Sequence, residues 1–259
     1  MTATAPPKFL YRYRSNATRY IWDELEKAVK SREFYFSSAD SLNDPFEIRP
    51  SIEKPSDRVF LDILSAKYGK NPVLSRDAIG KRIGRKISRQ EHRKSFKDYA
   101  PTLDVANWML EQMEQSFSKM NSRTRVVCFN ETPSSLPMWA HYANNHQGIC
   151  LRFELVMTER FADEKIPLQV SYSNTRPVLD IGDYEKSGFG SQDTQSDAAM
   201  DFVRSVFLTK ANDWSYEKEW RAFDNSNKPP GYEAMSILRP NSILIGINAQ
   251  KDFKEKLIQ

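Results

Sequence analysis

Two strand-like runs, Arg125-Val-Val-Cys-Phe129 and Gly148-Ile-Cys-Leu-Arg-Phe-Glu154, decide the fold class of this chain. Both are rich in β-branched, aliphatic and aromatic residues, which are typical of strands. Similar runs recur before and after them, and the helical segments are grouped instead of following every strand. Strands and helices that cluster in this way favour an α+β fold with a mixed or antiparallel sheet.

Further elements are predicted on both sides of these two runs. They are strands at 8–14, 33–38, 168–172, 219–223, 234–238 and 242–246 and helices at 197–210 and 251–258. Apolar residues at helical spacing predict one more helix, which Ser15 or Asn16 would cap. Residues 40–47 are rich in turn formers, and the Ser-, Gly- and Asp-rich residues 184–198 predict a mobile loop.

Residues 57–120 differ from the rest because apolar residues recur there at helical spacing. We expect a single domain over residues 1–259 that carries this stretch as a helical insertion. A cluster of Lys and Arg residues runs from Lys81 to Lys97 within it. Such a basic run is compatible with an interface for RNA or DNA and equally with a solvated helix face.

The composition is that of a globular chain. Of 259 residues, 39% are hydrophobic and 12% aromatic, which is enough for a substantial core and excludes wholesale disorder. The net charge of +4 is too small by itself to indicate a strong nucleic-acid binder. Two cysteines, Cys128 and Cys150, cannot build a disulfide framework. No run reaches the roughly 20 apolar residues of a membrane span, and the first residues carry no secretory signal, so we expect a cytoplasmic protein without a membrane partner.

Several familiar catalytic motifs are missing. No Gly-x-Gly-x-x-Gly or Gly-x-Ser-x-Gly occurs, and the segment from Gly80 to Gly84 lacks the spacing of a phosphate-binding loop. Four residues of types that bind zinc fall close together in sequence, Cys128, His141, His146 and Cys150. Their spacing differs from that of a zinc knuckle and both cysteines are flanked by strand residues, so we predict no metal site.

Two segments combine polar groups with aromatic residues. The first joins Tyr11-Arg12-Tyr13-Arg14 with Ser37-Ser38 and Asn43-Asp44-Pro45-Phe46-Glu47. Its alternative interpretation is a strand surface followed by a turn. The second is Met138-Trp-Ala-His-Tyr-Ala-Asn-Asn-His146, which spans about two helical turns before a strand. Its aromatic rings would suit stacking against a planar ligand ring or packing in the core.

A third segment, Trp214-Ser-Tyr-Glu-Lys-Glu-Trp-Arg221, contains two glutamates that we place two residues apart on one strand. Glu217 and Glu219 would then project to the same face, where repulsion would raise the pKa of one of them. The alternative is an exposed strand face on which Lys218 and Arg221 balance the charge. The aromatic flanks favour a site, since they would partly desolvate the carboxylates.

In this order, the three segments resemble the bacterial domain-of-unknown-function family 2971 (DUF2971). The motifs that carry the resemblance are Tyr11 to Arg14, Asn43 to Glu47, Cys128-Phe129, Met138 to Cys150 and Trp214 to Arg221. They cover nearly the whole chain apart from the helical insertion.

The layout is also similar to the ADP-ribosyltransferase superfamily, which implies a split β-sheet core and NAD as a substrate. By this resemblance Glu219 would be the catalytic carboxylate, and Glu217 would orient or deprotonate the accepting group. Arg14 or Tyr13 on the first strand would hold NAD, and Ser37 or Ser38 would shape the nicotinamide pocket. The full set of residues expected to bind NAD is Tyr13, Arg14, Ser37, Ser38, Asn43, Trp139, His141 and Tyr142.

The implied chemistry is cleavage of the nicotinamide–ribose bond, whose oxocarbenium-like transition state a nearby carboxylate stabilises. Enzymes of this class in bacteria often act as toxins or in phage defence, so the resemblance implies ADP-ribosylation of a nucleic acid or protein, or hydrolysis of NAD. One alternative is a non-catalytic module that binds a nucleic acid or protein. Another is a metal-dependent nuclease that would use Asp44, Glu47, Glu217 and Glu219.

Overall fold

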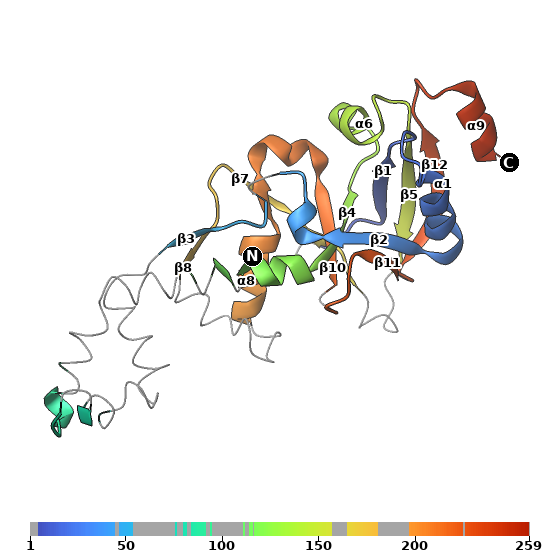
Figure 1. The fold of residues 1–259 in the computed structure, drawn as a ribbon. Coiled ribbons are helices and arrows are strands. Elements are labelled where there is room, and N and C mark those ends of the chain that lie inside the picture. The colour runs from blue at the N-terminus through green and yellow to red at the C-terminus, as the bar shows by residue number, and fades with distance from the viewer. Residues whose placement is uncertain are drawn as a thin grey trace. The chain divides into compact units, whose positions relative to one another are not determined.

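The fold is described by a computed structural model (Figure 1). It describes residues 5–44, 47–53, 84–91, 117–156, 165–180, 197–224 and 226–258, and a few positions between 76 and 115. The chain divides into two compact units. The first contains Met1–Arg49, Met120–Arg176 and Phe207–Gln259, and the second contains Pro50–Lys119 and Pro177–Val206.

An eight-stranded antiparallel sheet forms the centre of the first unit. Its strands are β1 (Phe9–Arg14), β2 (Glu33–Ser38), β4 (Arg125–Asn130), β5 (Ile149–Leu155), β6 (Leu168–Gln169), β10 (Glu219–Asp224), β11 (Gly231–Ala234) and β12 (Leu238–Ile245). The strand order is β11-β2-β4-β1-β5-β12, and β10 pairs with both β4 and β6. An antiparallel sheet with grouped helices confirms the predicted α+β class.

Two short parallel pairs lie outside this sheet. In the first unit, β7 (Ser171–Ser173) pairs with β9 (Thr209–Ala211). In the second unit, β3 (Ser51–Glu53) pairs with β8 (Val178–Asp180).

The main sheet splits where β1 and β2 both approach the same edge of β4 (Figure 1). One end of this edge pairs with β1 through the single residue pair Tyr11 and Asn130. The other end pairs with β2, where Ser37 lies opposite Val126. The opposite edge of β4 is paired with β10 from end to end. The strands β1 and β2 therefore diverge around the middle of β4, and this gap holds the site described below.

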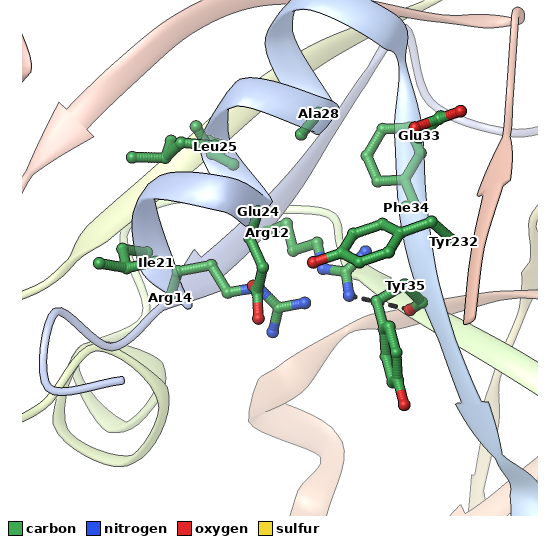
Figure 2. A pocket seen from close by; sticks show the side chains of 11 residues that line it. Arg12, Arg14, Ile21, Glu24, Leu25, Ala28, Glu33, Phe34, Tyr35 and Tyr232 are labelled. Carbon is green, nitrogen blue, oxygen red and sulfur yellow. Dashed lines mark hydrogen bonds and ion pairs between the residues drawn. The ribbon is translucent and has the colours of Figure 1, made fainter. Parts of the chain in front are cut away.

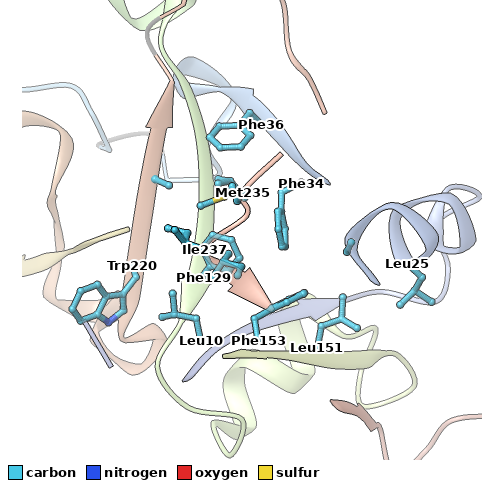
Figure 3. Packing of buried hydrophobic residues seen from close by; sticks show 14 of the residues in the cluster. Leu10, Leu25, Phe34, Phe36, Phe129, Leu151, Phe153, Trp220, Met235 and Ile237 are labelled. Atoms are coloured by element: carbon cyan, nitrogen blue, oxygen red, sulfur yellow. The ribbon is translucent and has the colours of Figure 1, made fainter. Parts of the chain in front are cut away.

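A hydrophobic core beneath the sheet fixes these strands relative to one another (Figure 3). The rings of Phe34, Phe129 and Phe153, from β2, β4 and β5, meet edge to face with centroids 5.0, 5.4 and 6.4 Å apart. Burial of each such side chain contributes about 1.5–3 kcal/mol. Further members of this core are Leu10, Ile21, Leu25, Ala28, Phe36, Val127, Ile149, Leu151, Trp220, Ala222, Met235, Ile237 and Leu238.

The described helices are short. They are α1 (Ile21–Glu26), which continues into a π-helical turn (Lys27–Ser31), α6 (Leu136–Tyr142), α8 (Asp197–Phe207) and α9 (Lys251–Ile258), with 3₁₀ turns η2 (Ala39–Ser41) and η4 (Asn212–Glu217). The α6 side chain Met138 packs with Tyr13, Ala143 and Cys150 in a second cluster. The turn after α6 sits close to β1, because a Cβ atom on Gly148 would overlap the carbonyl oxygen of Arg14.

Several predicted elements agree with the structure, and others need correction. The strand at 33–38 and the helix at 251–258 lie where the sequence predicts them. The helix expected to begin after Ser15 or Asn16 begins at Ile21 instead. The strand expected at 234–238 is replaced by β11 and a turn before β12. The helix predicted over 197–210 ends at Phe207, so Lys210 lies in β9.

Other expectations fall mainly on undescribed parts of the chain. Most of the helical insertion at 57–120, most of the basic cluster from Lys81 to Lys97 and nearly all of the loop predicted at 184–198 lie outside the described residues. Where the chain is described, no helix has the length and apolar character that crossing a membrane requires.

Candidate functional site

A cavity of about 260 Å³ opens in the split of the main sheet. Its walls are residues of β1, β2 and β4, the turn after β2, α6, β9 and the segment from η4 into β10. The lining residues are Arg12, Tyr13, Arg14, Tyr35, Ser37, Ser41, Leu42, Asn43, Glu47, Val126, Val127, Cys128, Asn130, Met138, Tyr142, Lys210, Glu217 and Glu219. Segments that are far apart in sequence thus meet in one concave site, as ligand sites in proteins commonly do.

One end of the cavity is cationic. Arg12 is 9% exposed, and its guanidinium lies 5.8 Å from the ring centroids of both Phe34 and Phe129. It donates one hydrogen bond, to the Tyr35 carbonyl oxygen at 3.3 Å (Figure 2). Among the described residues, no carboxylate forms an ion pair with Arg12. Burial and the charge of Arg14 lower the pKa of Arg12, so a cation is held here without full compensation.

Arg14 stands beside Arg12 and has a carboxylate partner. Its Nε lies 2.8 Å from Oε2 of Glu24 on α1 (Figure 2). This end of the cavity therefore carries two guanidinium groups and one close carboxylate, which leaves it net positive.

The other end of the cavity is anionic. Lys210 of β9 is buried and bridges two glutamates, with Nζ 2.7 Å from Oε2 of Glu217 and 3.2 Å from Oε2 of Glu219. Oε2 of a third glutamate, Glu47, lies 3.6 Å from the same nitrogen. Arg221 supplies a second cation, since its Nε and Nη2 donate to the two oxygens of Glu219 at 2.8 and 2.9 Å.

These five residues, Glu47, Lys210, Glu217, Glu219 and Arg221, are called the carboxylate cluster below. Arg221 also forms an ion pair with Glu47 and donates to the Phe207 carbonyl oxygen at 2.7 Å. With all three carboxylates ionised, they exceed the two cations by one negative charge. Because all five side chains are buried, this charge acts in a region of low dielectric constant.

Burial has consequences for the protonation of the cluster. It raises the pKa of Glu219 to about 7, and the neighbouring Glu217 acts in the same direction, while Lys210 opposes both. The two carboxylates raise the pKa of Lys210 against the effect of its burial, so this lysine stays charged.

Neighbouring polar groups hold Glu217 and Glu219 in place. The hydroxyl group of Tyr142 donates to Oε1 of Glu217 at 2.7 Å and accepts a hydrogen bond from Nδ2 of Asn43 at 2.9 Å. Nδ2 of Asn130 donates to the Glu217 carbonyl oxygen at 2.9 Å. The backbone N–H of Glu219 donates to the Tyr172 hydroxyl group at 2.8 Å. This network positions both carboxylates before any ligand binds.

The backbone brings the two glutamates together in a way that corrects the sequence prediction. Glu217 is the last residue of η4, and Glu219 begins β10, so they do not share a strand. Between them Lys218 adopts a left-handed conformation with φ 43°, which is uncommon for a residue other than glycine. This turn aims both side chains at Lys210. Both glutamates are 3% exposed, so the alternative of an exposed, charge-balanced strand face is wrong.

The structure brings together seven of the residues proposed from the sequence. Tyr13, Arg14, Ser37, Asn43, Tyr142, Glu217 and Glu219 all line the cavity. Three others are not among the lining residues. Trp139 packs edge-on against Tyr13, with centroids 5.2 Å apart, and its indole N–H donates to Pro133. His141 lies beside Tyr216, at 6.3 Å between centroids, and Ser38 pairs with Arg125 at the end of β2.

Sequence reasoning missed the cations of the site. The sequence predicts Lys210 at the end of a helix and Arg221 only as a charge-balancing surface residue. Arg12 belongs to the motif Tyr11 to Arg14 but has no predicted function of its own. Glu47 is predicted only as a metal ligand in the nuclease alternative. The available signal is the apolar run Trp220-Arg-Ala-Phe223 around Arg221, because a charged residue in a buried strand needs a carboxylate partner.

Within the residues that the structure describes, no group of three or more His, Cys, Asp or Glu side chains is arranged to hold a metal ion. Cys128 lines the cavity beside Glu219, and burial raises its pKa well above the usual value. This thiol is therefore a weak nucleophile in the folded protein.

Comparison with known proteins gives one match. No curated protein and no solved structure matches the chain. Residues 138–222 match the model of a family described as "Protein of unknown function (DUF2971)". This stretch contains Tyr142, Lys210, Glu217, Glu219 and Arg221, so the match includes most of the anionic end of the cavity. The match supports the resemblance to the DUF2971 family that the sequence motifs predict.

Proposed function

We propose that the cavity binds NAD and that the chain is an ADP-ribosyltransferase-like enzyme that cleaves the nicotinamide–ribose bond. The observation that carries the proposal is the opposite charge of the two ends of the cavity. NAD carries negative phosphates at its centre and a positive pyridinium ring at one end. A ligand of this kind would satisfy the only partly compensated Arg12 at one end and the excess negative charge of the ionised carboxylate cluster at the other.

The residues present fit such a ligand. Arg12 and Arg14 would face the phosphates, because guanidinium groups bind phosphate oxygens in pairs. The rings of Tyr13 and Tyr142 would lie beside the nicotinamide ring. A volume of about 260 Å³ is smaller than a typical pocket for a drug-sized ligand and suits the nicotinamide riboside end. The remainder of NAD would extend past the two arginines.

NAD supplies a leaving group that departs as neutral nicotinamide, taking both electrons of the bond between its ring nitrogen and ribose C1′. Positive charge then develops on the ribose ring, where Glu219 would stabilise it and hold a ribose hydroxyl group. Glu217 would accept the proton of the water or acceptor group that attacks C1′. The excess negative charge of the carboxylate cluster favours this transition state over the ground state.

The test is nicotinamide release from NAD by the purified protein, in the presence and absence of total RNA or cell lysate as a source of acceptors. We expect Glu219→Gln to lower the rate on the order of 100-fold or more while NAD still binds in calorimetry. The matched control is Glu154→Gln on β5, whose carboxylate pairs with Lys8 at the surface, 3.5 Å away. This control should retain the wild-type rate.

Two results would count against the proposal. One is the absence of both nicotinamide release and NAD binding, which would favour a non-catalytic binding module. The other is release that continues in Glu219→Gln, which would place the chemistry elsewhere. Thermal unfolding of each variant shows whether a lost activity reflects a lost fold.

A further inference from the structure

We propose that Glu24 is the internal counter-ion of the cationic end and sets how much negative charge the cavity accepts there. Glu24 would form its ion pair with Arg14 in the absence of a ligand. It would compete with the phosphate groups of a ligand for that guanidinium group. This inference rests on the proposed function only in taking the same cavity as the ligand site. Its test below uses inorganic anions and does not depend on turnover of NAD.

The position of Glu24 carries the first step. Its Oε2 lies 2.8 Å from Nε of Arg14, and the two side chains are 25% and 29% exposed. Glu24 and both arginines line one narrow groove between α1 and the strands β1 and β2 (Figure 2). Arg12, Arg14 and Tyr35 line this groove and the main cavity alike. A phosphate group bound to Arg14 in the cavity would therefore lie next to the carboxylate of Glu24.

The charges carry the second step. Arg14 lowers the pKa of Arg12, and Glu24 raises it, so the carboxylate compensates both guanidinium groups at once. Glu33 lines the same groove, but Figure 2 shows its carboxylate pointing away from the two arginines. Tyr232 completes the groove with a phenol whose pKa burial raises to about 12, so it stays neutral. Glu24 is thus the negative charge close to the two arginines. A ligand anion must either displace it from Arg14 or bind beside it in spite of their repulsion.

The consequence is a preference that depends on ligand charge. Each negative charge placed at Arg12 and Arg14 is attracted by two cations and repelled by Glu24. Removal of Glu24 should therefore strengthen the binding of every anion, and more so for anions of higher charge. In the intact site, Glu24 favours phosphodiester groups, with one charge each, over terminal phosphates that carry up to two.

The experiment measures the affinity of inorganic pyrophosphate and inorganic phosphate by calorimetry. We expect Glu24→Gln to bind pyrophosphate about 3- to 10-fold more tightly than the wild type, with a smaller gain for phosphate. The matched control is Glu26→Gln on the same helix, which changes the net charge equally. Glu26 pairs with Lys30 at the surface, 2.9 Å away, and lines neither the groove nor the cavity.

A double-mutant cycle makes the test specific. In an Arg14→Gln background, Glu24→Gln should change the affinity for pyrophosphate less than it does in the wild type. An unchanged or weaker affinity in Glu24→Gln would overturn the inference, as would an equal gain in Glu26→Gln. Tighter pyrophosphate binding without nicotinamide release would support Glu24 as the counter-ion and refute the proposed enzyme. Nicotinamide release together with an unchanged affinity of Glu24→Gln for pyrophosphate would support the proposed enzyme and refute Glu24 as the counter-ion.

Discussion

Glu219 titrates in an environment that favours its neutral form. Its pKa is raised to about 7 in the folded protein from an ordinary value of 4.5, so the folded state binds more protons than the unfolded state between these values. Glu219 therefore stabilises the fold below about pH 4.5, and this contribution is lost as the pH rises through 7. Relative to Glu219→Gln, the free energy of unfolding of the wild type should fall by roughly 3 kcal/mol from pH 4.5 to 8.

Urea unfolding of both proteins at several pH values measures this difference, and a difference that is constant with pH would contradict it. The proposed activity should follow the opposite course. Because the ionised carboxylate stabilises the developing positive charge, nicotinamide release should decline as the pH falls below about 7.

Lys210 holds the two glutamates together, and its loss should leave both carboxylates buried without their shared cation. We expect Lys210→Met to lower the free energy of unfolding by about 3 kcal/mol at pH 8 and to abolish nicotinamide release. The loss of stability should shrink at pH 5, where Glu219, whose pKa is raised to about 7, takes up a proton. The matched control is Lys228→Met, whose ammonium group pairs with Glu233 and is 58% exposed, so the change should stay within about 1 kcal/mol. Equal losses in the two variants would refute this account.

At the scale of elements, the turn between α6 and β5 determines where Tyr142 meets Glu217. A Cβ atom at Gly148 would overlap the carbonyl oxygen of Arg14, so Gly148→Ala must push this turn away from β1. We expect a loss of about 2 kcal/mol or more in the free energy of unfolding, and weaker binding of any cavity ligand. In the control Gly231→Ala, the nearest atom to the new Cβ is 3.8 Å away, so it should unfold like the wild type. Thermal unfolding and calorimetry compare the two, and a stable, fully binding Gly148→Ala protein would contradict the expectation.

The sequence predicted elements with strong local signals and missed those that depend on distant partners. The strand Glu33–Ser38 alternates buried and exposed positions and was predicted to the residue. The short strand β9 has no such pattern of its own, because it is stabilised by pairing with β7 from a distant part of the chain. Lys210 was misplaced for that reason. The left-handed conformation of Lys218 also has no signal in the sequence, so the true route from Glu217 to Glu219 could not be predicted.

At the scale of the whole sheet, the grouping of strands in the sequence predicted the class of fold, but it did not predict the position of the cavity. The split depends on which strands share the edge of β4, and that choice is made by long-range pairing. The motifs that resemble the DUF2971 family nevertheless contribute residues to one cavity. Their residues come from segments that are far apart along the chain and yet line one cavity, which periodicity or composition alone would not reveal.

The strands β1 and β4 are joined by one ladder pair, Tyr11 with Asn130, and this short pairing has a mechanical consequence. The two walls of the cavity belong to half-sheets that are each well paired, β1 with β5 and β4 with β10. If these half-sheets rotated slightly about that ladder pair, the width of the cavity would change while the hydrogen bonds within each half-sheet were kept. We therefore expect a molecule that widens the split to alter the binding of a cavity ligand without contacting Glu219.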